Sequence, residues 1–124
     1  MPYTTYKLIH FFGIFLLIVA LAAGSMNAMR GGNRSDWPWR RALGASHGIA
    51  AFLILLGGFG MLARLDVLHD DGLPGWVIAK LVIWLTLAAA IVMPRLGQGY
   101  AKALMAALPL LAVGAGALAL FKPF

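Results

Sequence analysis

The sequence predicts an all-α integral membrane protein in which residues 1–124 form a single antiparallel bundle of four transmembrane helices. Of the 124 residues, 62% are hydrophobic and only 11% are charged, and the mean hydropathy is +0.88. A soluble domain is nearer half apolar and a quarter charged. The chain also contains four apolar stretches, each close to the roughly 20 helical residues that cross a bilayer. Its length leaves no room for a separate soluble domain.

Runs without charge locate the four helices. Residues 8–29 and 42–63 contain no formally charged residue, and the third run is interrupted only by Lys80. The fourth run is uninterrupted, although Pro109 should kink it because proline has no N–H to donate. We therefore predict helices at about 6–27, 44–65, 74–94 and 102–121.

The first of these helices has a competing interpretation. Lys7 precedes an apolar run that ends in small residues, the pattern of a signal peptide with its cleavage zone: Ala22, Ala23, Gly24 and Ser25. The run is nevertheless long enough to span a bilayer, and we interpret it as a transmembrane helix.

Aromatic and basic residues mark the expected membrane interface. The most polar stretch, residues 30–41, separates the first two helices, and we interpret it as an interfacial loop. Tryptophan and arginine are typical of the headgroup level. The predicted interface residues are Trp37, Trp39, Arg40, Arg41 and, at the start of the third helix, Trp76.

The basic residues also predict the orientation. Six lie on the side of the first and third loops: Arg30, Arg34, Arg40, Arg41, Arg95 and Lys102. Three lie on the other side: Lys7, Arg64 and Lys122. The positive-inside rule then puts both termini in the periplasm of a bacterial inner membrane. The formal charge of +6 is thus explained by topology and anionic lipid, and we expect no nucleic-acid partner.

Two polar residues inside the spans are the candidate site. His10 shares a helix face with small residues, Gly13 and Ala20 among them, and should point into the bundle. Lys80 either faces an aqueous cleft or extends its amine to the interface. Each lies about 6 Å below the outer boundary. With His69 from the outer loop, they form a candidate anion, porphyrin or metal site, although a lone histidine is more often simply bonded to a carbonyl.

Other arrangements are disfavoured. His47 should lie near the opposite boundary, roughly 20 Å from His10 in depth. Two histidines on one iron are only about 4 Å apart, so we exclude a bis-histidine haem that joins them. The chain has no cysteine, and no Asp or Glu lies within a span. Disulfides, thiolate metal sites and covalent haem attachment are therefore excluded, and proton-coupled export is disfavoured.

Three short motifs resemble a known family. They are Lys7-Leu-Ile-His10, the apolar run from His47 to Leu56-Gly57-Gly58, and Trp76-Val-Ile-Ala-Lys80-Leu81. Together they resemble the SirB family and, more distantly, the HemJ-type protoporphyrinogen oxidases. The HemJ resemblance implies haem b as cofactor and functional roles for the histidine and the lysine, here His10 and Lys80. The chain lacks the longer, aromatic-rich first helix of those oxidases.

Three functions follow as hypotheses. The first is a haem- or porphyrin-binding protein with a redox or tetrapyrrole-related role, in which His10 is the candidate iron ligand and Lys80 pairs with an acidic group. The second is a non-catalytic accessory or scaffolding subunit, either as a homo-oligomer or within a larger membrane complex. Small residues such as Ala112 and Gly116 suit that role. The third is a small transporter, and Lys80 is the one charged residue in the body of a predicted span that could couple ions there.

Overall fold

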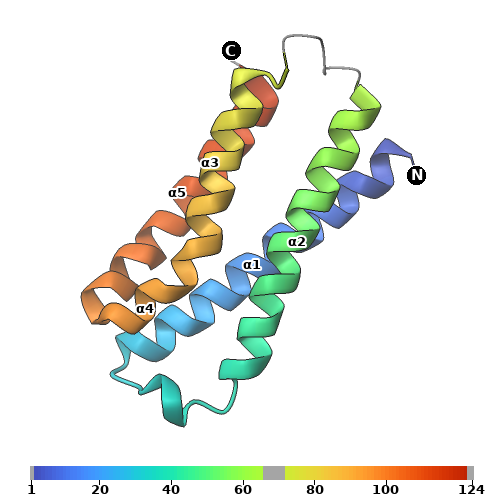
Figure 1. Ribbon diagram of the computed structural model, residues 1–124. Coiled ribbons are helices and arrows are strands. Elements are labelled where there is room, and N and C mark those ends of the chain that lie inside the picture. The colour runs from blue at the N-terminus through green and yellow to red at the C-terminus, as the bar shows by residue number, and fades with distance from the viewer. Residues whose placement is uncertain (1, 66–71, 123–124) are drawn as a thin grey trace.

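The computed structural model describes residues 2–65 and 72–122. Within them, four helical spans are long and apolar enough to cross a membrane, and neighbouring spans run in opposite directions (Figure 1). The spans are α1 (Tyr3–Met29), α2 (Arg40–Leu65), Gly75–Leu96 and α5 (Gln98–Phe121). The chain is a multi-pass membrane protein, and the predicted all-α four-helix architecture is confirmed. α1 begins and α5 ends at the same end of the bundle (Figure 1).

The third span is not the single helix that the sequence predicts. It consists of α3 (Gly75–Ala89), the 3₁₀ turn η2 (Ala90–Val92) and the short α4 (Met93–Leu96). Pro94 explains the interruption, because proline lacks an N–H and its ring clashes with the carbonyl four residues earlier. That carbonyl belongs to Ala90, where the 3₁₀ turn begins. By contrast, α5 is assigned as one helix through Pro109.

Three helices begin three or four residues earlier than predicted. α1, α2 and α5 start at Tyr3, Arg40 and Gln98. The predicted starts lie later because they were placed close to where each uncharged run begins. Basic residues can occupy the first turns because a helix continues beyond the hydrocarbon. The 27 residues of α1 extend about 40 Å, against a core about 30 Å thick.

α1 is the central helix of the bundle. In its most apolar stretch of 18 residues, 33% of the residues are buried, against 11–17% in the corresponding stretches of the other spans. Towards its end, Leu17 and Leu21 form a core cluster with Leu104 and Leu108 of α5. Nearer its start, α1 packs closely on α2. α2 and α3 diverge where α2 ends and α3 begins, while α3 and α5 lie side by side (Figure 1).

Glycines set the distance between α1 and α2. A Cβ atom at Gly13 would lie 2.9 Å from the backbone nitrogen of Ile54. A Cβ atom at Gly57 would lie 2.7 Å from both the backbone nitrogen and the Cβ of His10. Both distances are shorter than real Cβ contacts, so the two backbones approach each other only because these side chains are missing.

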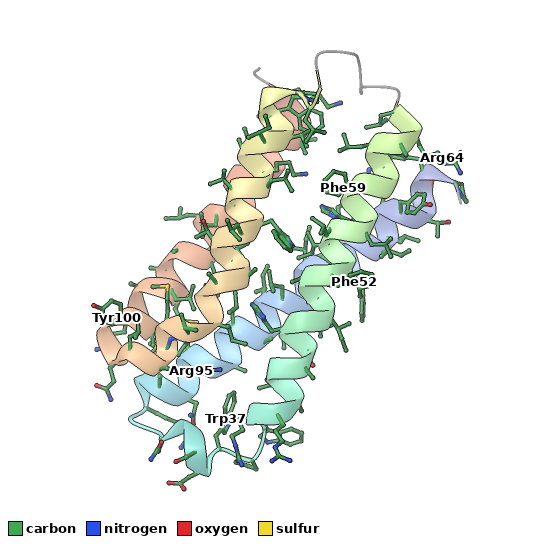
Figure 2. The ribbon with its side chains drawn as sticks, in the orientation of Figure 1. Trp37, Phe52, Phe59, Arg64, Arg95 and Tyr100 are labelled. Atoms are coloured by element: carbon green, nitrogen blue, oxygen red, sulfur yellow. The ribbon has the colours of Figure 1, made fainter. Side chains whose placement is uncertain are left out.

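Large apolar side chains cover the outside of the bundle. They include Phe12, Phe15, Phe52, Val82, Leu85, Leu110 and Val113, all of which are exposed (Figure 2 shows Phe52 pointing outwards). In water such a surface would drive aggregation. In a bilayer it faces lipid chains, and the helical backbone satisfies its own hydrogen bonds. The surface composition therefore agrees with the four spans.

We expect Gly57→Ala to lower the free energy of unfolding by about 1–3 kcal/mol, because the added methyl group overlaps the backbone of α1. Gly48→Ala is the matched control, since a Cβ there meets nothing within 4 Å. Unfolding in mixed micelles with increasing dodecyl sulfate, followed by far-UV circular dichroism, measures both. Equal stabilities for the two variants would contradict the close approach.

Candidate functional site

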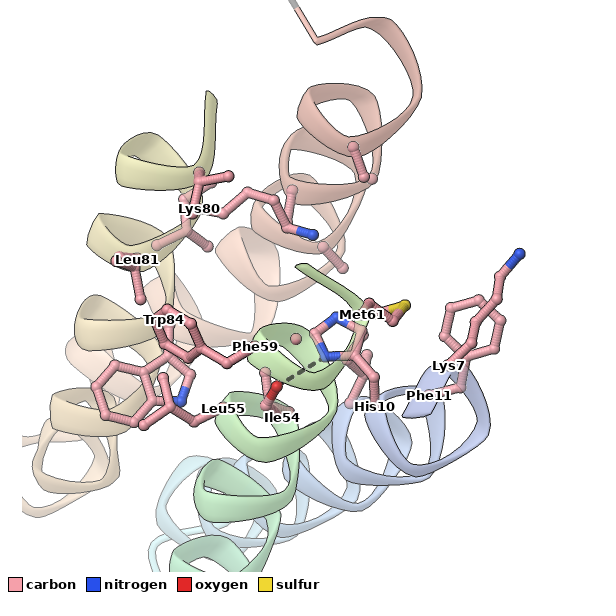
Figure 3. Close-up of a pocket in the computed structure, with 18 of the residues that line it drawn as sticks. Lys7, His10, Phe11, Ile54, Leu55, Phe59, Met61, Lys80, Leu81 and Trp84 are labelled. Atoms are coloured by element: carbon pink, nitrogen blue, oxygen red, sulfur yellow. Dashed lines mark hydrogen bonds between the residues drawn. The ribbon is translucent and has the colours of Figure 1, made fainter. Parts of the chain in front are cut away.

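A cavity of about 550 Å³ lies among α1, α2, α3 and α5 (Figure 3). This volume is within the range of small-molecule sites, about 300–1,000 Å³. Most of the lining is aliphatic or aromatic. The polar groups among it include His10 from α1, Lys80 and Trp84 from α3, and Lys7 and Lys122. An apolar chamber with a few polar groups is the usual form of a ligand site.

His10 is held by a single hydrogen bond to the neighbouring helix. It is 7% exposed, and its Nδ1 lies 2.8 Å from the carbonyl oxygen of Ile54 (Figure 3). Because a carbonyl only accepts, Nδ1 must carry the hydrogen and donate it. In the neutral imidazole, Nε2 then keeps its lone pair. This arrangement is the one that orients a metal-binding histidine, whose other nitrogen donates to a backbone carbonyl.

Gly58 of α2 makes room for the imidazole ring. A Cβ atom at this position would lie 3.6 Å from both Cε1 and Nδ1 of His10, which is already contact distance. A larger side chain there would extend into the space that the ring occupies. The backbone of His10 packs against Gly57 and its ring packs against Gly58, so this pair of glycines positions the histidine.

Lys80 faces the same cavity from α3. Its side chain is half-buried and extends from α3 into the cavity, on the side where His10 lies (Figure 3). The structure thus brings His10 and Lys80 together at one cavity. Two further lysines line it, but each is held against an aromatic ring. The amine of Lys7 lies 5.7 Å from the ring centre of Phe11, and that of Lys122 lies 5.4 Å from that of Trp76.

Of the other predicted site residues, His69 falls outside the residues that the structure describes. Trp76 lies in the first turn of α3 and also lines this cavity. It is 9% exposed and packs with Leu62 and Val77 under Lys122, so it is buried at this end of the bundle rather than exposed at its surface.

The predicted interface residues of the first loop lie at the opposite end of the bundle from Trp76. Trp39 is 63% exposed and Trp37 is half-buried. Arg40 and Arg41 form the first turn of α2, where Arg40 Nη1 donates to the carbonyl of Trp37 at 3.1 Å. Figure 2 shows Trp37 at this end, together with Arg95.

His47 lies apart from the cavity. It is buried on α2, and its Nε2 lies 3.2 Å from the carbonyl oxygen of Leu87, to which it donates. His10 packs against Gly57, ten residues further along α2, which corresponds to about 15 Å. The separation is shorter than the predicted 20 Å because α1 and α2 both start earlier. It is still far beyond the 4 Å that one iron would require.

Trp84 is a cavity residue that the sequence analysis missed. Its indole nitrogen donates to the carbonyl oxygen of Ala51 at 2.9 Å, so it ties α3 to α2. It also lines the cavity below Lys80, towards the end of α3 (Figure 3). Its position four residues after Lys80, on the same helix face, was the available signal.

Comparisons with known proteins do not place this chain in a family. No family model, no curated protein and no solved structure matches this chain. Within residues 2–65 and 72–122, no group of three or more His, Asp or Glu side chains could hold a metal ion.

We expect Trp84→Phe to lower the free energy of unfolding by about 0.6–1.7 kcal/mol, the range for a hydrogen bond between membrane helices. Phenylalanine keeps an aromatic ring but has no N–H, so the carbonyl of Ala51 loses the hydrogen bond from the indole. Trp39→Phe is the control, because that side chain is 63% exposed. Unfolding by dodecyl sulfate compares the two. If both variants match the parent protein, the bond does not join α2 to α3.

Proposed function

We propose that this protein binds haem b or a related porphyrin in the cavity, and that it serves a redox or tetrapyrrole-related role in a bacterial inner membrane with both termini periplasmic. One observation carries the proposal. His10 donates through Nδ1 to Ile54, and none of the described residues bonds to its Nε2, which lies beside an apolar cavity that Lys80 also lines. The resemblance to the HemJ-type oxidases supports the same two residues.

The donor set fits a porphyrin better than a free metal ion. A porphyrin brings four nitrogen ligands of its own, so the protein would need to supply only one imidazole, as in globins and peroxidases, and His10 would hold the group. When bound, haem would supply one-electron chemistry. The protein's own contributions are the orientation of His10 by Ile54 and an apolar lining that excludes water.

Lys80 supplies the complementary charge. A porphyrin carries propionate carboxylates, and an ammonium group in a low-dielectric cavity attracts them more strongly than it would in water. Lys80 is half-buried on the cavity wall, whereas the amines of Lys7 and Lys122 lie against aromatic rings. We therefore assign the carboxylate contact, of a propionate or of an acidic substrate, to Lys80.

An accessory-subunit role is the second candidate, and one observation favours it. Ala112 and Gly116 of α5, together with Ala115 and Ala119, form a small-residue wall of this same cavity. Small residues are where membrane helices approach closely. An apolar helix of a partner, or of a second copy, could enter between the diverging α2 and α3 and pack against this wall.

We expect the purified protein to show a Soret band that sharpens on reduction with dithionite and is lost in His10→Ala. His47→Ala is the matched control, because this second buried histidine does not line the cavity. Size-exclusion chromatography and circular dichroism establish that both variants are folded. A protein that stays colourless after haem is added would contradict haem binding. A strictly monomeric protein in native-membrane crosslinking would count against the subunit role.

We expect Lys80→Met to keep the Soret band but to weaken haem binding about 10- to 150-fold, the effect of losing about 1.5–3 kcal/mol from a hydrogen bond to a charged group. Lys102→Met controls for the change in net charge, since Lys102 is exposed and lies outside the cavity lining. Haem titration in detergent gives both dissociation constants. Equal dissociation constants for the two variants would mean that Lys80 does not contact the haem.

A further inference from the structure

A second cavity, of about 580 Å³, lies at the other end of the bundle from His10. Its walls come from the end of α1, the loop with the 3₁₀ turn η1 (Arg34–Asp36), the start of α2, α4 and the start of α5. Figure 2 shows two of its lining residues, Trp37 and Arg95, at this end. Its polar lining residues are Asn27, Asn33, Ser35, Arg40, Arg95 and Gln98.

Hydrogen-bond donors dominate this lining. Arg40 and Arg95 are its charged members, and no acidic side chain belongs to the described lining. Arg40 donates through Nη1 to the carbonyl of Trp37. Its guanidinium has five N–H donors, so the others remain for a ligand. The amide oxygen of Asn27, a 6% exposed residue, accepts from Arg30 Nη2 at 2.9 Å, so its NH₂ group remains as a donor. An excess of donors with two positive charges suits an anion.

Two helix N-termini contribute to the cavity wall, where the C-terminal turn of α1, with the opposite partial charge, also lies. α2 begins at Arg40 and α5 begins at Gln98, and both residues line the cavity. The N-terminus of a helix carries a partial positive charge and unpaired N–H groups. Neither helix has an acidic residue in its first turn, and Gly97, the N-cap of α5, makes no side-chain capping bond. No carboxylate of these first turns therefore offsets the arginines.

We propose that this cavity binds the phosphate group of an anionic phospholipid. Arginine forks match phosphate oxygens in pairs, which makes them the preferred phosphate ligands in proteins. The cavity lies at the end of the spans, beside Trp37, where lipid headgroups meet a transmembrane helix. Basic pockets of this kind between membrane helices bind acidic headgroups. The site is independent of the His10 cavity and of any haem.

The test compares two charge-matched double variants. Arg40→Gln/Arg95→Gln removes the two arginines of the cavity. Arg41→Gln/Lys102→Gln removes two exposed basic residues, neither of which lines it. Native mass spectrometry measures retained phosphatidylglycerol relative to phosphatidylcholine. At about fivefold for each basic contact, we expect the cavity variant to lose about 25-fold in selectivity and the control to lose little.

Three results would overturn the proposal. Equal losses in both double variants would mean that general surface charge retains the lipid. No selectivity for phosphatidylglycerol in the parent protein would exclude a headgroup site. A rise in the unfolding temperature with inorganic phosphate in phosphatidylcholine nanodiscs, dependent on Arg40 and Arg95 and without any lipid selectivity, would mean that the ligand is a soluble phosphate. If the cavity double variant fails to fold, Arg95→Gln alone repeats the test, because Arg95 is exposed.

Discussion

The rest of the structure depends on the backbone contact between α1 and α2. Gly13 and Gly57 allow the two helices to approach more closely than any other side chain would permit. The contact brings His10 to the carbonyl of Ile54 and fixes the direction of α1 across the bundle. α5 then packs against the later half of α1, and α3 packs against α5. α3 therefore stays at a distance from α2, and the space between them is the first cavity.

Three of the buried or half-buried polar side chains inside this bundle are paired in the same way. In hydrocarbon, an unpaired donor is costly, and a backbone carbonyl of a neighbouring helix is the acceptor at hand, although the buried hydroxyl of Ser25 finds no partner among the described residues. His10, His47 and Trp84 each bond a backbone carbonyl of a neighbouring helix. The two histidines are chemically alike, but of the two only His10 lines either of the cavities described above. The surroundings of the side chain, rather than its type, distinguish a candidate ligand from a structural link.

The sequence predicted the parts of the structure that depend on composition. Four apolar runs predict four spans, and Pro94, which clashes with the carbonyl of Ala90, also accounts for the break in the third span after α3. The meeting of His10 and Lys80 at one cavity follows from helix direction and rise per residue. The bond from His10 to Ile54, the role of Trp84 and the loop wall of the second cavity could not be predicted in this way. Each depends on the packing of helices distant in sequence, which periodicity along one helix does not contain.

The position of Lys80 also has a consequence for biosynthesis. Transmembrane helices enter the bilayer before they pack, so α3 must first be stable without the cavity that later receives its amine. A lysine at the bilayer centre costs about 2.5–3.5 kcal/mol, whereas one nearer the end can extend its amine to the headgroups. Lys80 lies five residues after the start of α3, or about 8 Å. Its long methylene stem therefore allows insertion of the lone helix, and the same stem reaches the cavity after assembly.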